Sequence, residues 1–123
     1  MNTFGRRIEP AVTSELRAAA QKEADGDGAA SFRHLERAHV LGQASTVQHV
    51  RVHVQMLLWA VRHRVSREAA GQVLRIIGAA TKTAIGWVPT GNTGGSNISP
   101  FRPVPIPADL QKVLDSAHAA RHR

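Results

Sequence analysis

The sequence predicts an all-α protein, an antiparallel helical bundle of about four main helices followed by a Pro/Gly-rich strap and a short last helix. Apolar residues recur at three- and four-residue spacing, and glycine-rich stop signals divide this pattern into helix-sized segments. The composition combines many alanines with only 4% aromatic residues, which favours closely packed helices over a sheet. At 123 residues, we expect a single domain, residues 1–123.

The first two helices are predicted to form a hairpin. The first spans Thr13–Ala24, because Thr13 can cap its N-terminus, and residues 1–12 are expected to be a flexible N-terminus. An Asp-Gly-Asp-Gly turn ends this helix, and the second spans Ser31–Gly42. This hairpin resembles the first unit of tetratricopeptide-like repeats, although the aromatic signature positions of those repeats are missing.

The third and fourth helices are predicted to supply most of the core. The third begins at Ser45 or Thr46 and ends at about His63. Its apolar face is expected to consist of Val50, Val54, Leu57, Leu58 and Val61. The fourth begins at Ser66 and fades toward Thr83. Its expected core residues are Val73, Leu74, Ile76 and Ile77.

The C-terminal third changes character. Residues 87–107 form the predicted strap, first a glycine- and asparagine-rich turn region and then a polyproline-like stretch. A last helix is expected over Ala108–Ala119, with residues 119–123 as a basic tail. The Gly91–Gly95 loop lacks the pattern of a phosphate-binding P-loop, so we interpret it as a structural turn.

Composition excludes several classes of function. There is no cysteine, which rules out disulfides, thiolate metal sites and a cysteine nucleophile. The formal charge is +7, but the arginines are scattered and do not form one stripe, so nucleic acid is not the expected partner. No apolar run reaches the ~20 residues that a membrane span needs, and residues 1–10 lack the apolar core of a signal peptide. We therefore expect a cytoplasmic protein.

Five of the seven histidines lie between His34 and His63. Glu36 and His39 are three residues apart on the second predicted helix, and His49 and His53 are four apart on the third, so each pair shares a helical face. Because the linker between these helices is short, they should fold back antiparallel. This pairs His39 with His49 and Glu36 with His53.

Three imidazoles and one carboxylate suit a transition metal such as zinc, iron or copper. Met56 follows His53 by one turn and would add a soft ligand for copper. The spacing of Glu36 and His39 is the one used by di-iron carboxylate bundles, but the second such pair is missing. The sequence thus predicts a metal site formed by Glu36, His39, His49, His53 and Met56.

Two alternatives stay open. The histidines could instead form structural hydrogen bonds in a non-enzymatic interaction module, whose grooves bind a partner protein or a second copy in a homodimer. The arginines could bind a polyanion. Nucleophilic catalysis has little support, because no serine lies in a recognisable nucleophile elbow, so the prediction leans away from an enzyme.

Three long segments resemble a small bacterial family that is catalogued as a domain of unknown function, DUF3703. They are Phe32–Gln43 (FRHLERAHVLGQ), the HVRVH run at His49–His53, and Gly91–Pro103 (GNTGGSNISPFRP). The resemblance covers about Pro10 to Leu114. It implies a bacterial protein whose signature includes the histidine hairpin and the strap, but no activity that could be transferred to particular residues.

Overall fold

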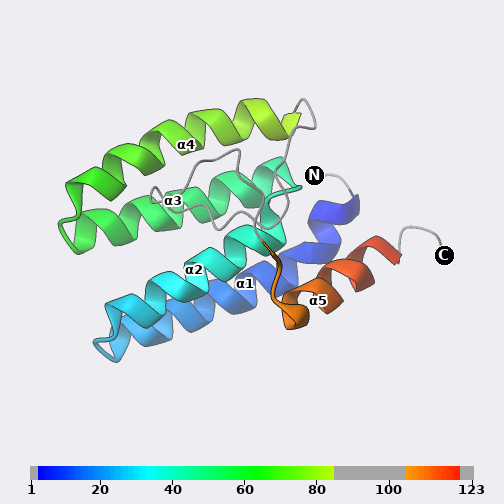
Figure 1. The fold of residues 1–123 in the computed structure, drawn as a ribbon, viewed down its shortest axis with the longest axis horizontal. Coiled ribbons are helices and arrows are strands. Elements are labelled where there is room, and N and C mark those ends of the chain that lie inside the picture. The colour runs from blue at the N-terminus through cyan, green and yellow to red at the C-terminus, as the bar shows by residue number, and fades with distance from the viewer. Residues whose placement is uncertain (1–2, 85–104, 120–123) are drawn as a thin grey trace.

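The computed structural model describes residues 3–84 and 105–119, and over these ranges the protein is all-α, as predicted. The described part contains five helices packed as a bundle and no strand (Figure 1). Their bounds are α1 Thr3–Ala24, α2 Gly28–Gly42, α3 Thr46–Arg62, α4 Ser66–Ala84 and α5 Ala108–Ala119. Helices α1 and α2 form one hairpin, α3 and α4 form another, and α5 lies beside α1.

Helix α1 begins at Thr3, so the predicted start at Thr13 is wrong. Residues 3–12, which the sequence analysis expects to be flexible, are part of this helix. Pro10 lies inside the helix, where its missing N–H normally ends the hydrogen-bond ladder. The helix continues through Pro10 because Phe4, Ile8 and Val12, which are four residues apart, all enter the core.

Helix α2 begins at Gly28, three residues before the predicted N-cap Ser31. The true cap is Asp27, whose Oδ1 accepts a hydrogen bond from the backbone N–H of Ala30 at 3.0 Å. Ser31 is buried within the helix. The Asp-Gly-Asp-Gly turn therefore both ends α1 and caps α2, whereas the predicted end of α2 at Gly42 is confirmed.

Helix α3 has the predicted limits, and its N-cap is Ser45. Its buried face, however, is not the predicted one. Three of the expected core residues, Val54, Leu58 and Val61, are 37%, 48% and 62% exposed. The face that packs into the bundle contains Gln48, His49, Val52, His53, Met56 and Ala60. The polar groups on this face are buried because they bond to one another and to neighbouring helices.

In helix α4, too, residues that the sequence predicts for the core are exposed. Val73 and Leu74 were predicted core residues, but they are 47% and 71% exposed. Ile76 is half-buried, and the side chain of Ile77 lies outside the described residues. The fully buried side chain of α4 is Gln72, which points at α3.

Helix α5 has the predicted bounds and closes the bundle against α1 and α2. Its Leu110 and Leu114 join the core. The Arg37 guanidinium of α2 donates a hydrogen bond to the Asp109 carboxylate, which lowers the pKa of Asp109 and raises that of Arg37. Of the predicted strap, residues 87–104 lie outside the described residues, as do residues 120–123 of the predicted tail; Ile106 packs against the core.

The described helices do not have the length and hydropathy of membrane spans. Within residues 3–84 and 105–119, no helix is both long and apolar enough to cross a bilayer.

Candidate metal centre

Three histidines meet in the interior, at the junction of the two hairpins. His39 on α2 points at His49 and His53 on α3. The Nε2 atom of His39 lies 2.9 Å from Nε2 of His49 and 3.1 Å from Nε2 of His53. All three side chains are at most 5% exposed. We call these residues the histidine cluster; one ring nitrogen of each lies within 4.8 Å of the others.

Local sequence explains why these rings meet. The turn after α2 is short, because the hydroxyl of Ser45 caps α3 by accepting a hydrogen bond from the backbone N–H of Gln48. A Cβ on Gly42 would lie 3.0 Å from Cβ of Gln48, so glycine lets the two helices approach closely at this end. His39 lies three residues before Gly42, and His49 lies one residue after Gln48. Their Nε2 atoms are 2.9 Å apart, which confirms the predicted pairing of His39 with His49.

A polar side chain of α4 orients one of the rings. Nδ1 of His53 lies 2.6 Å from Oε1 of Gln72, and Nε2 of Gln72 donates a hydrogen bond to Oε1 of Glu68 at 2.8 Å. Because a carboxylate accepts hydrogen bonds, the Gln72 amide must direct its NH₂ group at Glu68 and its oxygen at His53. His53 therefore donates from Nδ1, and in the neutral ring Nε2 keeps its lone pair facing the cluster.

Both short contacts of the cluster meet at one atom, Nε2 of His39. If His53 is neutral and protonated on Nδ1, its Nε2 carries no hydrogen. A hydrogen on Nε2 of His39 can lie on the line to His49 or to His53, but not on both. A hydrogen on Nε2 of His49 lies on the line to His39 and not between His39 and His53. A metal cation, by contrast, accepts a lone pair from all three nitrogens at once.

The distances also fit a metal ion. Zinc–nitrogen bonds are about 2.0–2.1 Å, so two nitrogen ligands of one tetrahedral zinc ion lie roughly 3.3 Å apart. The two Nε2 contacts of His39, at 2.9 and 3.1 Å, are shorter by a few tenths of an ångström. Small rotations of the rings would accommodate the ion without moving the helices.

Glu36, by contrast, does not join the histidine cluster. It lies one turn before His39 and about 60° around α2, and it lines a different cavity of about 270 Å³ with Val40, Pro105, Pro107 and Leu110. The α2 residue that faces His53 is His39, which contacts its Nε2 atom, and Gln72 of α4 contacts its Nδ1 atom. Met56 is fully buried in the core one turn after His53.

The other two histidines of this region have separate roles. Nδ1 of His34 lies 2.8 Å from the Glu15 carboxylate of α1. Nε2 of His63 lies 2.9 Å from the Glu23 carboxylate, and the His63 ring packs against Trp59. Both histidines fasten one helix to another outside the histidine cluster.

Sequence reasoning missed Gln72 and Glu68. They are four residues apart on α4, a spacing that places them on one face, but a glutamine and a glutamate at this spacing are also typical of a solvated surface. The signal that could have found them is the hairpin geometry of α3 and α4, which brings the helix after the turn back alongside His53.

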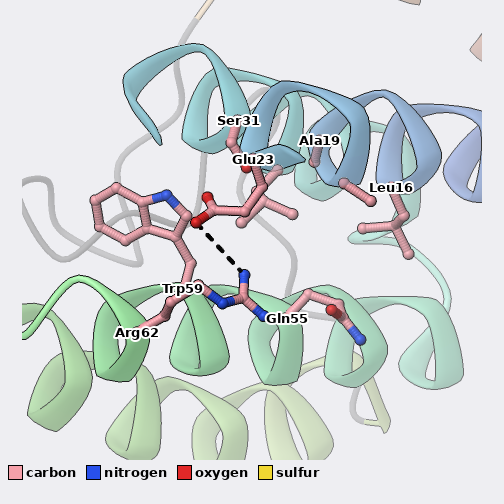
Figure 2. A pocket seen from close by; sticks show the side chains of 9 residues that line it. Leu16, Ala19, Glu23, Ser31, Gln55, Trp59 and Arg62 are labelled. Carbon is pink, nitrogen blue, oxygen red and sulfur yellow. Dashed lines mark ion pairs between the residues drawn. The ribbon is translucent and has the colours of Figure 1, made fainter. Parts of the chain in front are cut away.

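A second hollow lies between the hairpins, away from the histidine cluster (Figure 2). It measures about 100 Å³, and Figure 2 shows Glu23 of α1 pointing across it toward Arg62 of α3. The two charged groups are 3.9 Å apart. Trp59 closes one side by donating a hydrogen bond to the backbone oxygen of Gly28 at 3.0 Å. A hollow of this size has room for only a few water molecules, and the ion pair across it joins α3 to α1.

Fold and site together define a class, an all-α bundle with a buried three-histidine cluster between two helical hairpins. Comparison of the sequence with known families gives the particular family. The chain belongs to the family described as "Protein of unknown function (DUF3703)", whose pattern matches residues 6–114. No curated protein and no solved structure matches the chain.

Proposed function

We propose that the protein binds one transition-metal ion through the Nε2 atoms of His39, His49 and His53. The observation that carries this proposal is the convergence of the three Nε2 atoms in the interior, with His39 at 2.9 and 3.1 Å from the other two. A single cation placed between these atoms would be bound by the lone pairs of all three imidazoles at once.

The donor set indicates the class of metal. Imidazole nitrogens favour zinc, copper, iron and nickel over magnesium and calcium, which prefer oxygen ligands. Three nitrogens fill three of the four positions of a tetrahedral ion. Water, a small ligand or the thioether of Met56 would fill the fourth; a thioether would favour copper.

Gln72 supports this proposal from outside the ligand set. Metal-binding histidines usually donate their second ring N–H to an oxygen acceptor, which fixes the tautomer and directs the lone pair at the metal. The 2.6 Å contact between Nδ1 of His53 and Oε1 of Gln72 has this form. We place the function in metal handling or sensing, because the described residues around the site contribute no recognisable nucleophile.

The test measures metal content. Untagged protein is incubated with zinc, copper and iron in turn, desalted and analysed by plasma mass spectrometry beside a His39→Ala/His49→Ala double variant. The matched control is His34→Ala/His63→Ala, which removes two histidines that bond to Glu15 and Glu23 instead. The wild type and the control should hold about one ion per chain, and the cluster variant none.

Melting temperature gives an independent measure. Because a ligand that binds the folded state stabilises it by mass action, a chelator should lower the melting temperature of the wild type and the control. The cluster variant should not respond. Wild-type protein that takes up none of the three metals, or a control that loses metal as completely as the cluster variant, would refute the proposed site.

A further inference from the structure

Helix α3 has a second apolar face that the described helices leave exposed. Its members are at least 37% exposed, although they are all valine or leucine. They are Val47, Val54, Leu58 and Val61 on the helix, and Val65 in the connection to α4. On a helical wheel, the four positions of α3 fall within an arc of about 60°, opposite the face that carries the histidine cluster. We call this surface the α3 stripe.

The spacing of the α3 stripe is that of a helix-pairing seam. Its four members on α3 are separated by seven, four and three residues, which is the alternation that apolar residues follow where two helices pack side by side. The one gap in this alternation is filled by Arg51. A seam this narrow fits the apolar edge of a second helix.

Most of the charged side chains that border the α3 stripe are arginines. Helix α3 contains no aspartate or glutamate. Arg62, Arg64 and Arg67 are exposed near its C-terminal end, and Arg51 lies at its edge, where it donates hydrogen bonds to Thr13 and Gln48. Within the described residues, the ion pair found among these arginines is that of Arg62 with Glu23, at 3.9 Å. Exposed apolar residues bordered by one sign of charge indicate a partner of the opposite sign.

We infer that the α3 stripe binds an acidic amphipathic helix of a partner protein. A second copy of this chain fits poorly, because pairing two stripes would bring the arginines of both copies together in a protein whose formal charge is already +7. A membrane surface also fits less well. Interfacial helices anchor through a broad apolar face with tryptophan or phenylalanine, whereas the stripe is narrow and contains no aromatic residue.

The test uses three designed helical peptides that share a leucine seam at three- and four-residue spacing. Their flanking positions carry glutamate, glutamine or lysine. Binding to the full-length protein is measured by fluorescence anisotropy at low and high salt. The glutamate peptide should bind at least about tenfold more tightly than the glutamine peptide, and added salt should reduce this advantage. The lysine peptide should bind most weakly.

Matched variants locate the binding surface. Leu58→Glu/Val61→Glu places two carboxylates in the α3 stripe and should weaken binding of the glutamate peptide at least about tenfold. Leu74→Glu changes a leucine that is 71% exposed on α4, outside the stripe, and should leave binding unchanged. Circular dichroism melting measures whether each variant is folded.

Four results would overturn the inference. They are equal or absent binding of the three peptides, a wild-type dimer in sedimentation that Leu58→Glu/Val61→Glu abolishes, binding to anionic phosphatidylglycerol vesicles that the same variant abolishes, and unfolding of that variant. The second assigns the stripe to a second copy and the third to a membrane. The fourth shows that the stripe is packed within the chain. All four results can be obtained whether or not the protein binds a metal.

Discussion

The side chain of His53 has partners that fix what each ring nitrogen can do. Gln72 Oε1 lies 2.6 Å from Nδ1, and His39 Nε2 lies 3.1 Å from Nε2. Because Glu68 accepts from the Gln72 amide, the amide cannot turn around without placing its oxygen against a carboxylate. A residue on α4 thus sets the tautomer of a histidine on α3, and through it the direction of the lone pair.

This arrangement predicts the effect of changing Gln72. Gln72→Leu removes the acceptor for Nδ1 of His53 and should weaken metal binding about 10–100-fold, the usual cost of losing such an outer partner. The exchange Gln72→Glu/Glu68→Gln keeps an oxygen acceptor for Nδ1 of His53 and an amide donor facing the second oxygen, so it should retain most of the affinity. Dissociation constants come from competition with a chelator of known affinity. Wild-type affinity in Gln72→Leu would mean that Gln72 does not orient the ring.

At the scale of elements, the α1–α2 turn and the end of α3 are held together by close approach. A Cβ on Gly28, the first residue of α2, would lie 2.6 Å from Cε1 of His63. The His63 ring cannot move away freely, because it contacts the Glu23 carboxylate at 2.9 Å and packs against Trp59. An alanine at this position would therefore push the His63 ring away from Glu23 and Trp59.

Gly28→Ala should accordingly destabilise the fold by about 1–2 kcal/mol, because the new methyl group displaces His63 from both partners. The free energy of unfolding is measured by urea denaturation. In a His63→Ala background the obstacle is gone, so the same Gly28→Ala change should be neutral or slightly stabilising. Equal destabilisation in both backgrounds would show that the turn, and not the His63 ring, restricts residue 28.

The elements also show what the sequence could predict. The end of α2, the cap of α3 and both ends of α5 were predicted correctly, because glycine, serine and proline act within a few residues of the chain. The start of α1 was not, because its core contacts through Phe4 and Ile8 outweigh the local penalty of Pro10. Local signals fix helix ends unless tertiary contacts override them.

At the scale of the whole molecule, the orientation of α3 is the feature that the sequence left ambiguous. One face carries Val54, Leu58 and Val61, the other His49, His53 and Met56, and hydropathy alone favours the first for the core. The bundle buries the second, because polar groups on α2 and α4 satisfy its histidines. The histidine cluster was predicted from residue spacing. The contact of Gln72 with His53 and the position of Glu36 outside the cluster depend on how each helix is oriented about its own axis.

The cluster also joins the two halves of the bundle. His39 belongs to the α1–α2 hairpin, whereas His49, His53 and Gln72 belong to the α3–α4 hairpin. In the described part of the chain, α4 packs mainly against α3 (Figure 1). A metal ion bound by His39, His49 and His53 would therefore crosslink the hairpins, and its binding energy would add to the stability of their interface.

This crosslink predicts where the protein loosens when metal is removed. Chelation should raise amide hydrogen exchange in α3 and α4 around His53 and Gln72. The outer part of the α1–α2 hairpin, including Ala19, should change less, because that pair is held by its own apolar contacts. The His39→Ala/His49→Ala variant serves as the control and should exchange alike with and without chelator. A uniform rise over all helices would instead indicate that the two hairpins open as one unit, and that the metal stabilises the bundle without linking separable halves.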